Sequence, residues 1–169
     1  MHSILAVDDS ALIHQMYKLF LSRYKNCKLV SAMNGLEALD KLAQEEGIDL
    51  ILLDINMPVM NGLEFLQRMQ KEAAYKDIPV IIISTEGKEE DTIRGLKMGA
   101  RGYVKKPFQA STIAATCSAA QRIESGRPLT STRTVGVPVA WTAFSSSSWR
   151  PVRSRLATSK PSPFVPVLP

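Results

Sequence analysis

The stretch that decides the fold runs from Leu50 to Gly62 and reads LILLDINMPVMNG. Four successive aliphatic residues predict a strand buried on both faces, as in the middle of a parallel sheet flanked by helices. Asp54 follows these residues directly, and Pro58 and Gly62 then break the chain. We therefore expect the Asp54 carboxylate at the carboxyl end of a central strand, where open α/β sheets place their ligands.

Apolar patterning on both sides of this stretch predicts strands that alternate with helices. The other strands are expected at Ser3–Val7, Cys27–Ala32, Ile78–Ile83 and Gly102–Lys105, and the helices around Leu12–Phe20, Leu36–Ala43, Leu63–Met69, Ile93–Met98 and Ser111–Ile123. Short connections between a strand and the next helix imply right-handed crossovers and a parallel sheet. The predicted fold class is therefore α/β, a doubly wound five-stranded parallel sheet of the flavodoxin-like type.

Composition divides the chain after Gly126. Residues 1–126 carry 15 Lys and Arg against 16 Asp and Glu, whereas residues 127–169 carry 6 basic residues and no acidic one. Seven of the ten prolines and the Ser145–Ser148 run also lie in the second part. We expect residues 1–126 to form one folded domain and residues 127–169 to be a Pro/Ser/Arg-rich tail, disordered or non-native.

Several function classes receive little support from the composition. No stretch approaches the ~20 apolar residues of a membrane span, and the first residues lack the basic region of a secretory signal, so a cytoplasmic protein is expected. Cys27 and Cys117 are far apart without metal-ligand spacing, which favours two reduced thiols. Since residues 1–126 are nearly neutral, nucleic-acid binding is not expected of the folded part.

Polar side chains follow four of the predicted strands. Because the carboxyl ends of parallel strands meet at one edge of a sheet, these side chains are expected close together. They are Asp8 and Asp9, Asp54, Ser84 and Thr85, and Lys106. Each carboxylate has a simpler alternative role as a turn or capping residue; Asp8, for example, could cap the first helix, for which Ser10 is another candidate.

Three neighbouring carboxylates repel one another unless a cation lies among them. Oxygen ligands that leave room for water suit Mg²⁺. A carboxylate can act as a nucleophile toward phosphorus, and the charge on a transferring phosphoryl group is stabilised by a metal and an ammonium group. These residues therefore predict phosphoryl transfer onto Asp54, with the Lys106 ammonium and the Ser84 hydroxyl available to phosphate oxygens.

The motifs in their order point to a family. The chain has Asp-Asp after the first strand, DINMPVMNG after the third, Ser-Thr after the fourth and GYVKKPF around the fifth. This combination resembles the CheY-like receiver domains of bacterial two-component response regulators, over about residues 1–126. The resemblance implies a phosphorelay in which Asp54 accepts a phosphoryl group from a sensor histidine kinase or a histidine phosphotransfer protein.

The resemblance also implies the ligands of the metal, which is Mg²⁺ with Mn²⁺ as an alternative. Asp9, Asp54 and the backbone carbonyl of Asn56 are expected to bind it directly, and Asp8 mainly through water. Asn56 and Glu86 occupy the positions at which the family tunes access of hydrolytic water, so a short-lived acyl phosphate is expected.

Further roles follow from the same resemblance. Ser84 matches the hydroxyl switch, Tyr103 the aromatic switch and Lys106 the partner of the phosphate, and the bond before Pro107 is expected to be cis. Spacing alone does not separate Lys106 from Lys105, which could be a solvated edge charge. Tyr103 could equally be a half-buried strand aromatic without a switching role.

The resulting functional hypothesis is a single-domain response regulator that catalyses its own phosphotransfer and dephosphorylation. Its output is expected to be binding of an effector protein at the surface of the fourth helix, fifth strand and fifth helix. A chemotaxis or motility pathway remains open, as does a DNA-binding regulator that acts through the basic tail. A flavin-binding electron carrier and an aspartyl phosphatase are more remote alternatives, because Asp8-Asp9 repels a metal-free phosphate and Asn56 cannot be a general acid.

Overall fold

The computed structural model describes residues 2–24, 26–85, 89–113, 115 and 116. Within them the strands are β1 (His2–Val7), β2 (Cys27–Ala32), β3 (Ile48–Asp54), β4 (Val80–Ser84) and β5 (Gly102–Lys105). All neighbouring pairs are parallel, in the order β2-β1-β3-β4-β5. The predicted fold class is confirmed. The expected tail at residues 127–169 and the end of the fifth helix lie outside the described residues.

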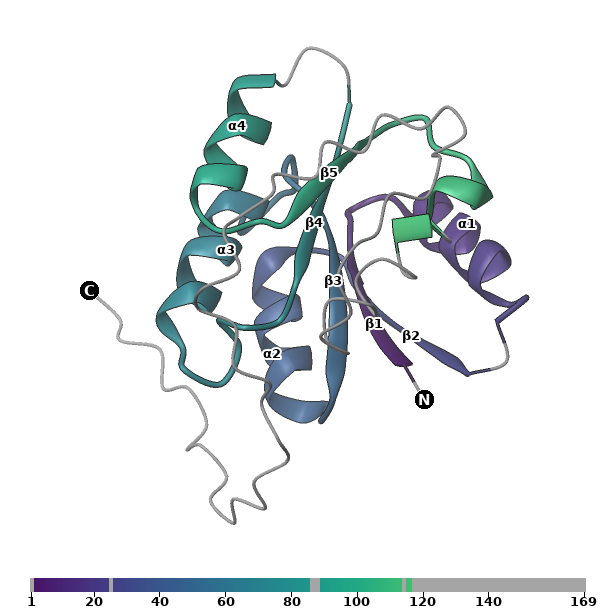
Figure 1. The fold of residues 1–169 in the computed structure, drawn as a ribbon. Coiled ribbons are helices and arrows are strands. Elements are labelled where there is room, and N and C mark those ends of the chain that lie inside the picture. Colours follow the sequence, from purple (N-terminus) through teal and green to yellow (C-terminus); the bar gives the residue numbers. More distant parts are fainter. Residues whose placement is uncertain (1, 25, 86–88, 114, 117–169) are drawn as a thin grey trace, which may run out of the picture.

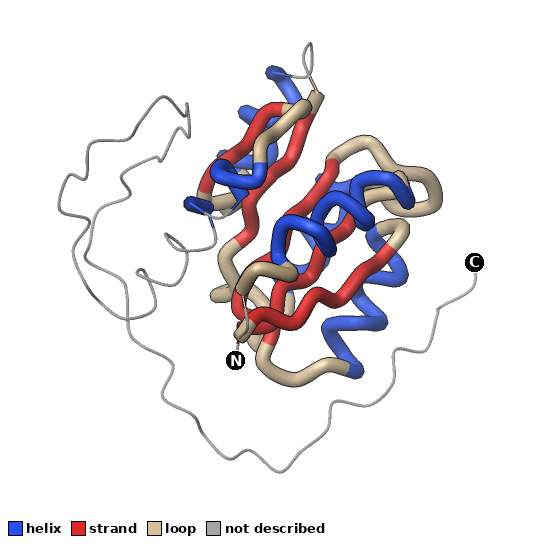
Figure 2. The backbone as a smooth tube through the Cα atoms, turned by 90° about the vertical axis from the view of Figure 1, so that its right-hand side faces the viewer, coloured by secondary structure: helices blue, strands red, loops and turns tan. Residues whose placement is uncertain are grey.

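The helices lie on both faces of the sheet. They are α1 (Ala11–Leu21), α2 (Gly35–Gln44), α3 (Gly62–Lys71) and α4 (Glu89–Lys97), and residues 110–113, 115 and 116 are also helical. In Figure 1, α2, α3 and α4 lie to one side of the strands and α1 to the other. Figure 2 shows the strands side by side between blue helical segments. The layers follow from the right-handed crossovers that link parallel strands.

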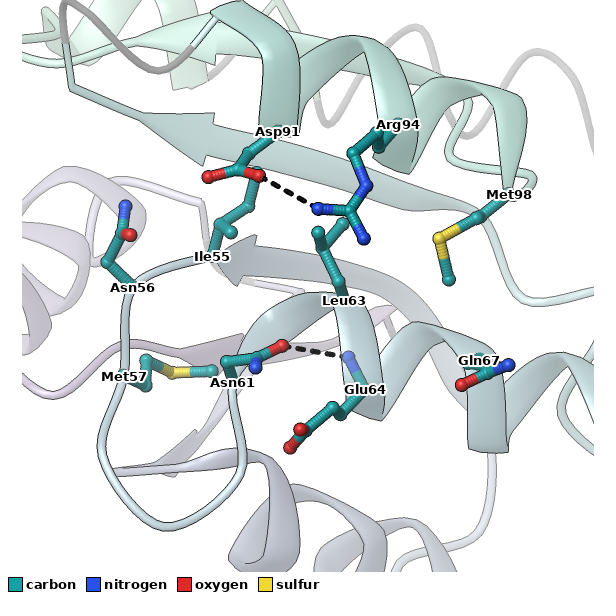
Figure 3. Close-up of a pocket in the computed structure, with 10 residues that line it drawn as sticks. All are labelled: Ile55, Asn56, Met57, Asn61, Leu63, Glu64, Gln67, Asp91, Arg94 and Met98. Carbon is teal, nitrogen blue, oxygen red and sulfur yellow. Dashed lines mark hydrogen bonds and ion pairs between the residues drawn. The ribbon is translucent and has the colours of Figure 1, made fainter.

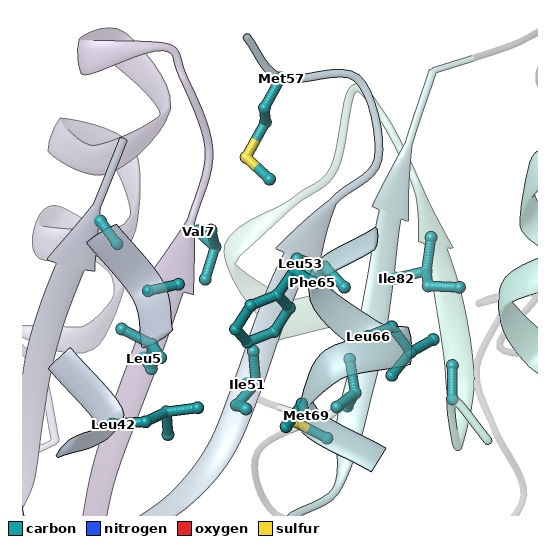
Figure 4. Packing of buried hydrophobic residues seen from close by; sticks show 14 of the residues in the cluster. Leu5, Val7, Leu42, Ile51, Leu53, Met57, Phe65, Leu66, Met69 and Ile82 are labelled. Atoms are coloured by element: carbon teal, nitrogen blue, oxygen red, sulfur yellow. The ribbon is translucent and has the colours of Figure 1, made fainter. Parts of the chain in front are cut away.

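Alternate residues of β3 supply two separate cores, as period-two geometry requires. Ile51 and Leu53 join the cluster with Phe65 and other residues of α2 and α3, which Figure 4 shows from close by. Leu50 and Leu52 join the opposite cluster, which includes Tyr17 of α1. β3 is therefore buried on both faces, as its sequence predicted, and this burial fixes the position of Asp54 at its end.

The second core continues past β5. The rings of Tyr17 and Phe108 stack with centroids 5.4 Å apart, and Phe20 meets Phe108 edge to face at 6.4 Å. Offset-stacked and edge-to-face pairs are the favourable arrangements of aromatic rings. These contacts hold the segment after β5 against α1.

The fourth strand begins later than the sequence pattern suggested. The prediction placed its start at Ile78, whereas β4 begins at Val80. Pro79 lacks a backbone N–H and cannot donate to the ladder, although its carbonyl still accepts from Ile51 N at 3.0 Å. The strand therefore starts at Val80, the first residue after Pro79 whose backbone can both donate and accept a hydrogen bond.

Helix starts differ in their caps. Asn34 and Asn61 each accept a hydrogen bond from a backbone N–H three residues later, at 2.9 Å; Figure 3 shows the one from Glu64 to Asn61. Ser10 occupies the N-cap position of α1, but its side chain makes no capping hydrogen bond. Its backbone N–H instead donates to Asp8 Oδ1 at 2.9 Å. Asp8 thus orders this turn, and Ser10 is the N-cap residue as expected, although its hydroxyl makes no capping hydrogen bond.

A glycine sets the distance between β3 and α3. A Cβ at Gly62 would lie 2.2 Å from the carbonyl oxygen of Asp54 and 2.9 Å from Cα of Ile55. The Gly62 N–H donates to the Ile55 carbonyl at 2.9 Å. Only a residue without a side chain permits this approach, so the first residue of α3 lies directly against the end of the central strand.

Within the described ranges, every helix is too short or too polar to cross a lipid bilayer.

Candidate acidic site at the sheet edge

Three carboxylates meet at the carboxyl ends of β1 and β3. Asp8 and Asp9 follow β1, Asp54 is the last residue of β3, and one oxygen from each lies within 4.8 Å of the others. The two strands are neighbours, with Val7 opposite Leu53, so their ends must coincide. Asp8 is 1% and Asp54 5% exposed, whereas Asp9 is open to solvent. The sequence prediction that these residues share one edge is confirmed.

Lys106 brings a cation to this edge. Its Nζ donates to Asp8 Oδ2 at 2.7 Å and to Asp54 Oδ1 at 3.1 Å. Its backbone N–H donates to the Ser84 carbonyl at 2.7 Å, which ties the segment after β5 to the end of β4. Lys105 is exposed, and the Lys106–Pro107 peptide is cis as expected. The structure thus places Lys106, rather than Lys105, beside the carboxylates.

Burial and charge act together on the two central groups. Burial raises the pKa of Asp54 above its usual range, with further raising by Asp8 and Asp9 and a partial offset by Lys106. Burial lowers the pKa of Lys106, but its contacts with Asp8 and Asp54 outweigh this effect, and the net pKa is raised. Lys106 therefore stays cationic, and the pocket still lacks positive charge around Asp54.

The donor set fits a small hard cation. All three groups are carboxylates, two of them are buried, and the Lys106 ammonium is the cation that contacts them within the part of the chain that the structure describes. The carboxylates carry more negative charge than the Lys106 ammonium can neutralise, and Asp9 is open to water. Such a site suits Mg²⁺, which binds few carboxylates and keeps several waters. Asn56, the other expected ligand, is exposed in the segment between β3 and α3.

A hollow between α3 and α4 adjoins this segment. Asn56 lies at one end, Leu63 at the centre, and the ion pair from Arg94 to Asp91, with an N–O distance of 3.4 Å, spans the α4 side (Figure 3). The hollow therefore borders the residues that follow Asp54 without including the carboxylates themselves.

The expected switch residues lie in two environments. Ser84 is buried at the end of β4, and its Oγ lies 3.0 Å from Oγ1 of Thr92 on α4. Tyr103 is half-buried and packs against the core on the α2–α4 side of the sheet. Thr85 is exposed. Glu86, the second expected tuning residue, lies outside the described residues.

Two further residues contact the site residues without having been predicted. His14 donates from Nε2 to the Asp8 carbonyl at 2.8 Å; since a carbonyl only accepts, the proton is assigned to Nε2. Thr92 pairs with Ser84. Both belong to helices, and their side chains reach the sheet edge only through helix packing. No sequence signal marks them, because one His or Thr at a helical position has no characteristic pattern.

Comparisons with known proteins agree with this geometry. The family model of the response regulator receiver domain matches residues 4–118. A chemotaxis protein CheY homologue of Campylobacter jejuni is 38% identical over 105 residues, 62% of this chain and 81% of that protein. The solved structure of the chemotaxis response regulator CheY4 of Vibrio cholerae is 38% identical, with a TM-score of 0.64, and the match covers 71% of this chain and 98% of that one.

A relative of another kind matches over part of its length. The phosphate regulon transcriptional regulatory protein PhoB of Escherichia coli is 36% identical over 119 residues, which are 70% of this chain and 51% of PhoB. The shared region is thus about half of that protein.

The parallel five-stranded sheet and these likenesses define the class, a flavodoxin-like α/β domain of the CheY type. The chain belongs to the bacterial response regulator receiver domain family. Receiver domains are phosphoacceptor proteins of two-component signalling that bind Mg²⁺ at an acidic pocket and interact with histidine kinases and downstream effectors.

Proposed function

We propose that this chain accepts a phosphoryl group on Asp54 from a phosphohistidine of a sensor histidine kinase or a histidine phosphotransfer protein. The observation that supports this function is the convergence on Asp54 of the Lys106 ammonium, 3.1 Å away, and the Asp8 and Asp9 carboxylates. A nucleophilic carboxylate, a fixed cation and a set of metal ligands are the parts that phosphoryl transfer requires.

The transfer is a displacement at phosphorus. An oxygen of the Asp54 carboxylate attacks, the P–N bond to the donor imidazole breaks, and the imidazole leaves with the bonding electrons and takes up a proton. Lys106 neutralises charge on the phosphoryl oxygens without reorganisation, since Asp8 and Asp54 already hold its ammonium group. The products are an acyl phosphate on Asp54 and a neutral histidine on the donor.

Mg²⁺ is the proposed cofactor, with Mn²⁺ as an alternative, held directly by Asp9, Asp54 and the Asn56 carbonyl and by Asp8 mainly through water. When bound, it supplies positive charge to the carboxylates and the phosphoryl oxygens. Asp9, the exposed carboxylate of the three, leaves this side of the pocket open to water and to the donor.

Hydrolysis resets the site. Water attacks phosphorus, the bond from phosphorus to the Asp54 oxygen breaks, and inorganic phosphate leaves while the carboxylate is restored. Asn56 is exposed two residues after Asp54, so it can restrict or admit this water, and Glu86 is assigned the same role from the family pattern. We expect a bulky apolar residue at position 56 to lengthen the lifetime of the phosphorylated form.

The output proposed is binding of an effector protein. The Ser84 hydroxyl donates to the phosphoryl group, Tyr103 changes its packing, and the surface of α4, β5 and the following helix changes shape. The position of Tyr103, half-buried on β5 at the sheet edge, supports this role because its ring lies between core and surface.

Mass spectrometry after incubation with Mg²⁺ and a small acyl phosphate tests the proposal. The expected result is one added phosphoryl group on the wild type and none on Asp54→Asn, with Asp40→Asn as the matched control at an exposed acid. A wild type that gains no phosphate, or Asp54→Asn that gains it as readily, would overturn the assignment.

A further inference from the structure

The hydroxyl groups of Ser84 and Thr92 lie 3.0 Å apart in the interior. Ser84 ends β4 and is 5% exposed, whereas Thr92 lies in α4 and is 6% exposed. Water cannot readily replace a partner in such a position, so loss of either hydroxyl takes from the other the hydrogen-bond partner that it has among the described residues. The pair therefore joins the end of β4 to α4 by a buried hydrogen bond that stabilises the contact between the two elements.

The neighbouring contact between α4 and β4 is made by a glycine. Gly95 lies one turn after Thr92, and Ile82 lies two residues before Ser84 on the same face of the strand. A Cβ at Gly95 would lie 2.3 Å from Cδ1 of Ile82. Thr92 and Gly95 are the buried residues of α4. Because both are small, they contribute few dispersion contacts. Half-buried Leu96 of α4 also packs against the core, and the hydroxyl pair adds a hydrogen bond to these apolar contacts.

We propose that Thr92 is a positioning residue that holds the Ser84 hydroxyl away from Asp54 in the unphosphorylated protein. The inference rests on the proposed function, since it assigns the regulation of the same site. Either hydroxyl of the pair can be the donor. When the Ser84 side chain turns so that its O–H reaches the phosphoryl group on Asp54, its oxygen moves away from Thr92, and α4 loses this hydrogen bond to β4.

The direction of this exchange follows from the acceptors. A phosphoryl oxygen is ionised, and hydrogen bonds to ionised acceptors are shorter and stronger than those between neutral hydroxyls. Phosphorylation can therefore displace Thr92, whereas the unphosphorylated site leaves the pair in place. The free energy gained from the hydrogen bond between Ser84 and the phosphoryl group is therefore reduced by the cost of breaking the hydrogen bond to Thr92. Through Ser84, Thr92 thus couples the state of Asp54 to α4.

Removing the hydroxyl at position 92 separates the hydrogen bond between Ser84 and Thr92 from the one between Ser84 and the phosphoryl group. Thr92→Val keeps the shape of the side chain but leaves Ser84 without its resting partner, so Ser84 should turn to the phosphoryl group more easily. We expect an effect of about threefold to tenfold, the range of one neutral hydrogen bond. Thr92→Ser keeps a hydroxyl and should restore wild-type behaviour.

The test compares the wild type with Thr92→Val, Thr92→Ser, Ser84→Ala and the double variant Ser84→Ala/Thr92→Val. The first readout is amide hydrogen exchange of α4 without phosphodonor. Thr92→Val and Ser84→Ala should each raise exchange by about threefold to tenfold, and the double variant should add nothing, because both remove the same hydrogen bond.

The second readout is the apparent dissociation constant for beryllofluoride, a phosphoryl mimic, in the presence of Mg²⁺. Thr92→Val should bind the mimic about threefold to tenfold more tightly than the wild type. Thr92→Ser should match the wild type. In the Ser84→Ala background, Thr92→Val should not change the dissociation constant, since the Ser84 hydroxyl that Thr92 holds in place is absent.

The outcomes are distinct. Equal binding of the mimic by wild type and Thr92→Val overturns the positioning role, even if α4 exchanges faster, because the pair is then structural only. A wild type that takes neither the mimic nor a phosphoryl group at Asp54 overturns the proposed function and this inference with it; the exchange data then still report whether the pair attaches α4.

Discussion

Lys106 Nζ lies 3.1 Å from Asp54 Oδ1, although the two residues are 52 positions apart in the chain. The contact exists because β3 and β5 both end at the same edge of a parallel sheet, with β4 between them. It gives the buried carboxylate a fixed cationic neighbour and turns the carboxyl ends of separate strands into one site.

The first prediction concerns this lysine. Lys106→Met should slow phosphorylation by a small acyl phosphate with Mg²⁺ by about 10²–10³-fold, as removal of one preorganised charge donor does elsewhere. Lys105→Met is the matched control, because Lys105 is adjacent but exposed. Initial rates of phosphate incorporation provide the measurement. Equal losses in the two variants would contradict the assignment of Lys106.

The second prediction concerns metal binding and stability. Mg²⁺ at 100 times its dissociation constant should raise the free energy of unfolding by about 2.7 kcal/mol, because it binds the folded pocket and not the unfolded chain. Thermal unfolding with Mg²⁺ and with chelator measures the difference. Asp9→Asn should remove most of the gain, and Asp40→Asn, an exposed substitution on α2, should keep it. A gain that survives Asp9→Asn would place the metal elsewhere.

The third prediction follows from the raised pKa of Asp54. Burial disfavours its ionised form in the folded protein, so this carboxyl favours folding below its unfolded pKa and loses that contribution as pH rises through the folded pKa. In chelator at pH 7, Asp54→Asn should therefore unfold a few degrees higher than the wild type, and the gap should narrow toward pH 4. A lower unfolding temperature for Asp54→Asn at pH 7 would show that the Lys106 contact outweighs burial.

The fourth prediction concerns the thiol of Cys27. Burial, and then the negative charge of Asp49, raise the pKa of this thiol. Because the thiolate is the nucleophile, Cys27 should react with iodoacetamide at pH 8 more slowly in the native protein than in denaturant. The chain has two cysteines, so the measurement is made in a Cys117→Ser background, in which Cys27 is the remaining thiol.

The contribution of Asp49 can be isolated in the same background. Asp49→Asn should speed alkylation and move its pH dependence downward, while the amide oxygen can still accept from Ser3 N, now 2.8 Å from the carboxylate. Asp40→Asn should have no effect. Unchanged alkylation in Asp49→Asn would leave burial as the sole cause.

The fifth prediction concerns the contact between Gly62 and the end of β3. Gly62→Ala forces a Cβ to within 2.2 Å of the Asp54 carbonyl, so it should lower the free energy of unfolding by about 1–3 kcal/mol and slow phosphorylation. Gly47→Ala is the comparison, since its φ is +75° but nothing lies within 4 Å of the added carbon. It should cost about 1–2 kcal/mol through its backbone alone and leave phosphorylation unchanged. Equal phosphorylation of both variants would contradict the link.

Much of the fold and the acidic edge could be predicted from local patterns. The aliphatic run before Asp54 required burial on both faces, and parallel pairing then forced the ends of β1 and β3 together. These inferences succeed because they depend on strand geometry alone, which fixes where a backbone ends. They do not depend on the rotamer of any one side chain.

Other features depend on packing that no local pattern encodes. Lys105 and Lys106 are adjacent, and only the turn after β5 decides which of them reaches Asp54. Ser10 was a reasonable cap by residue type, but Asp8 already accepts its backbone N–H. Thr92 follows three acidic residues and suggests an exposed helix face; its burial depends on how closely Gly95 lets α4 approach the sheet.

The ion pair from Lys106 to Asp8 spans 98 positions of the chain. Synthesis runs from the amino end, so a growing polypeptide carries all three carboxylates well before the lysine that faces them has been translated. The proposed phosphoryl transfer therefore becomes possible late, when β5 and the turn beyond it have been made, and a fragment that stops short of β5 keeps Asp54 but lacks its fixed cation.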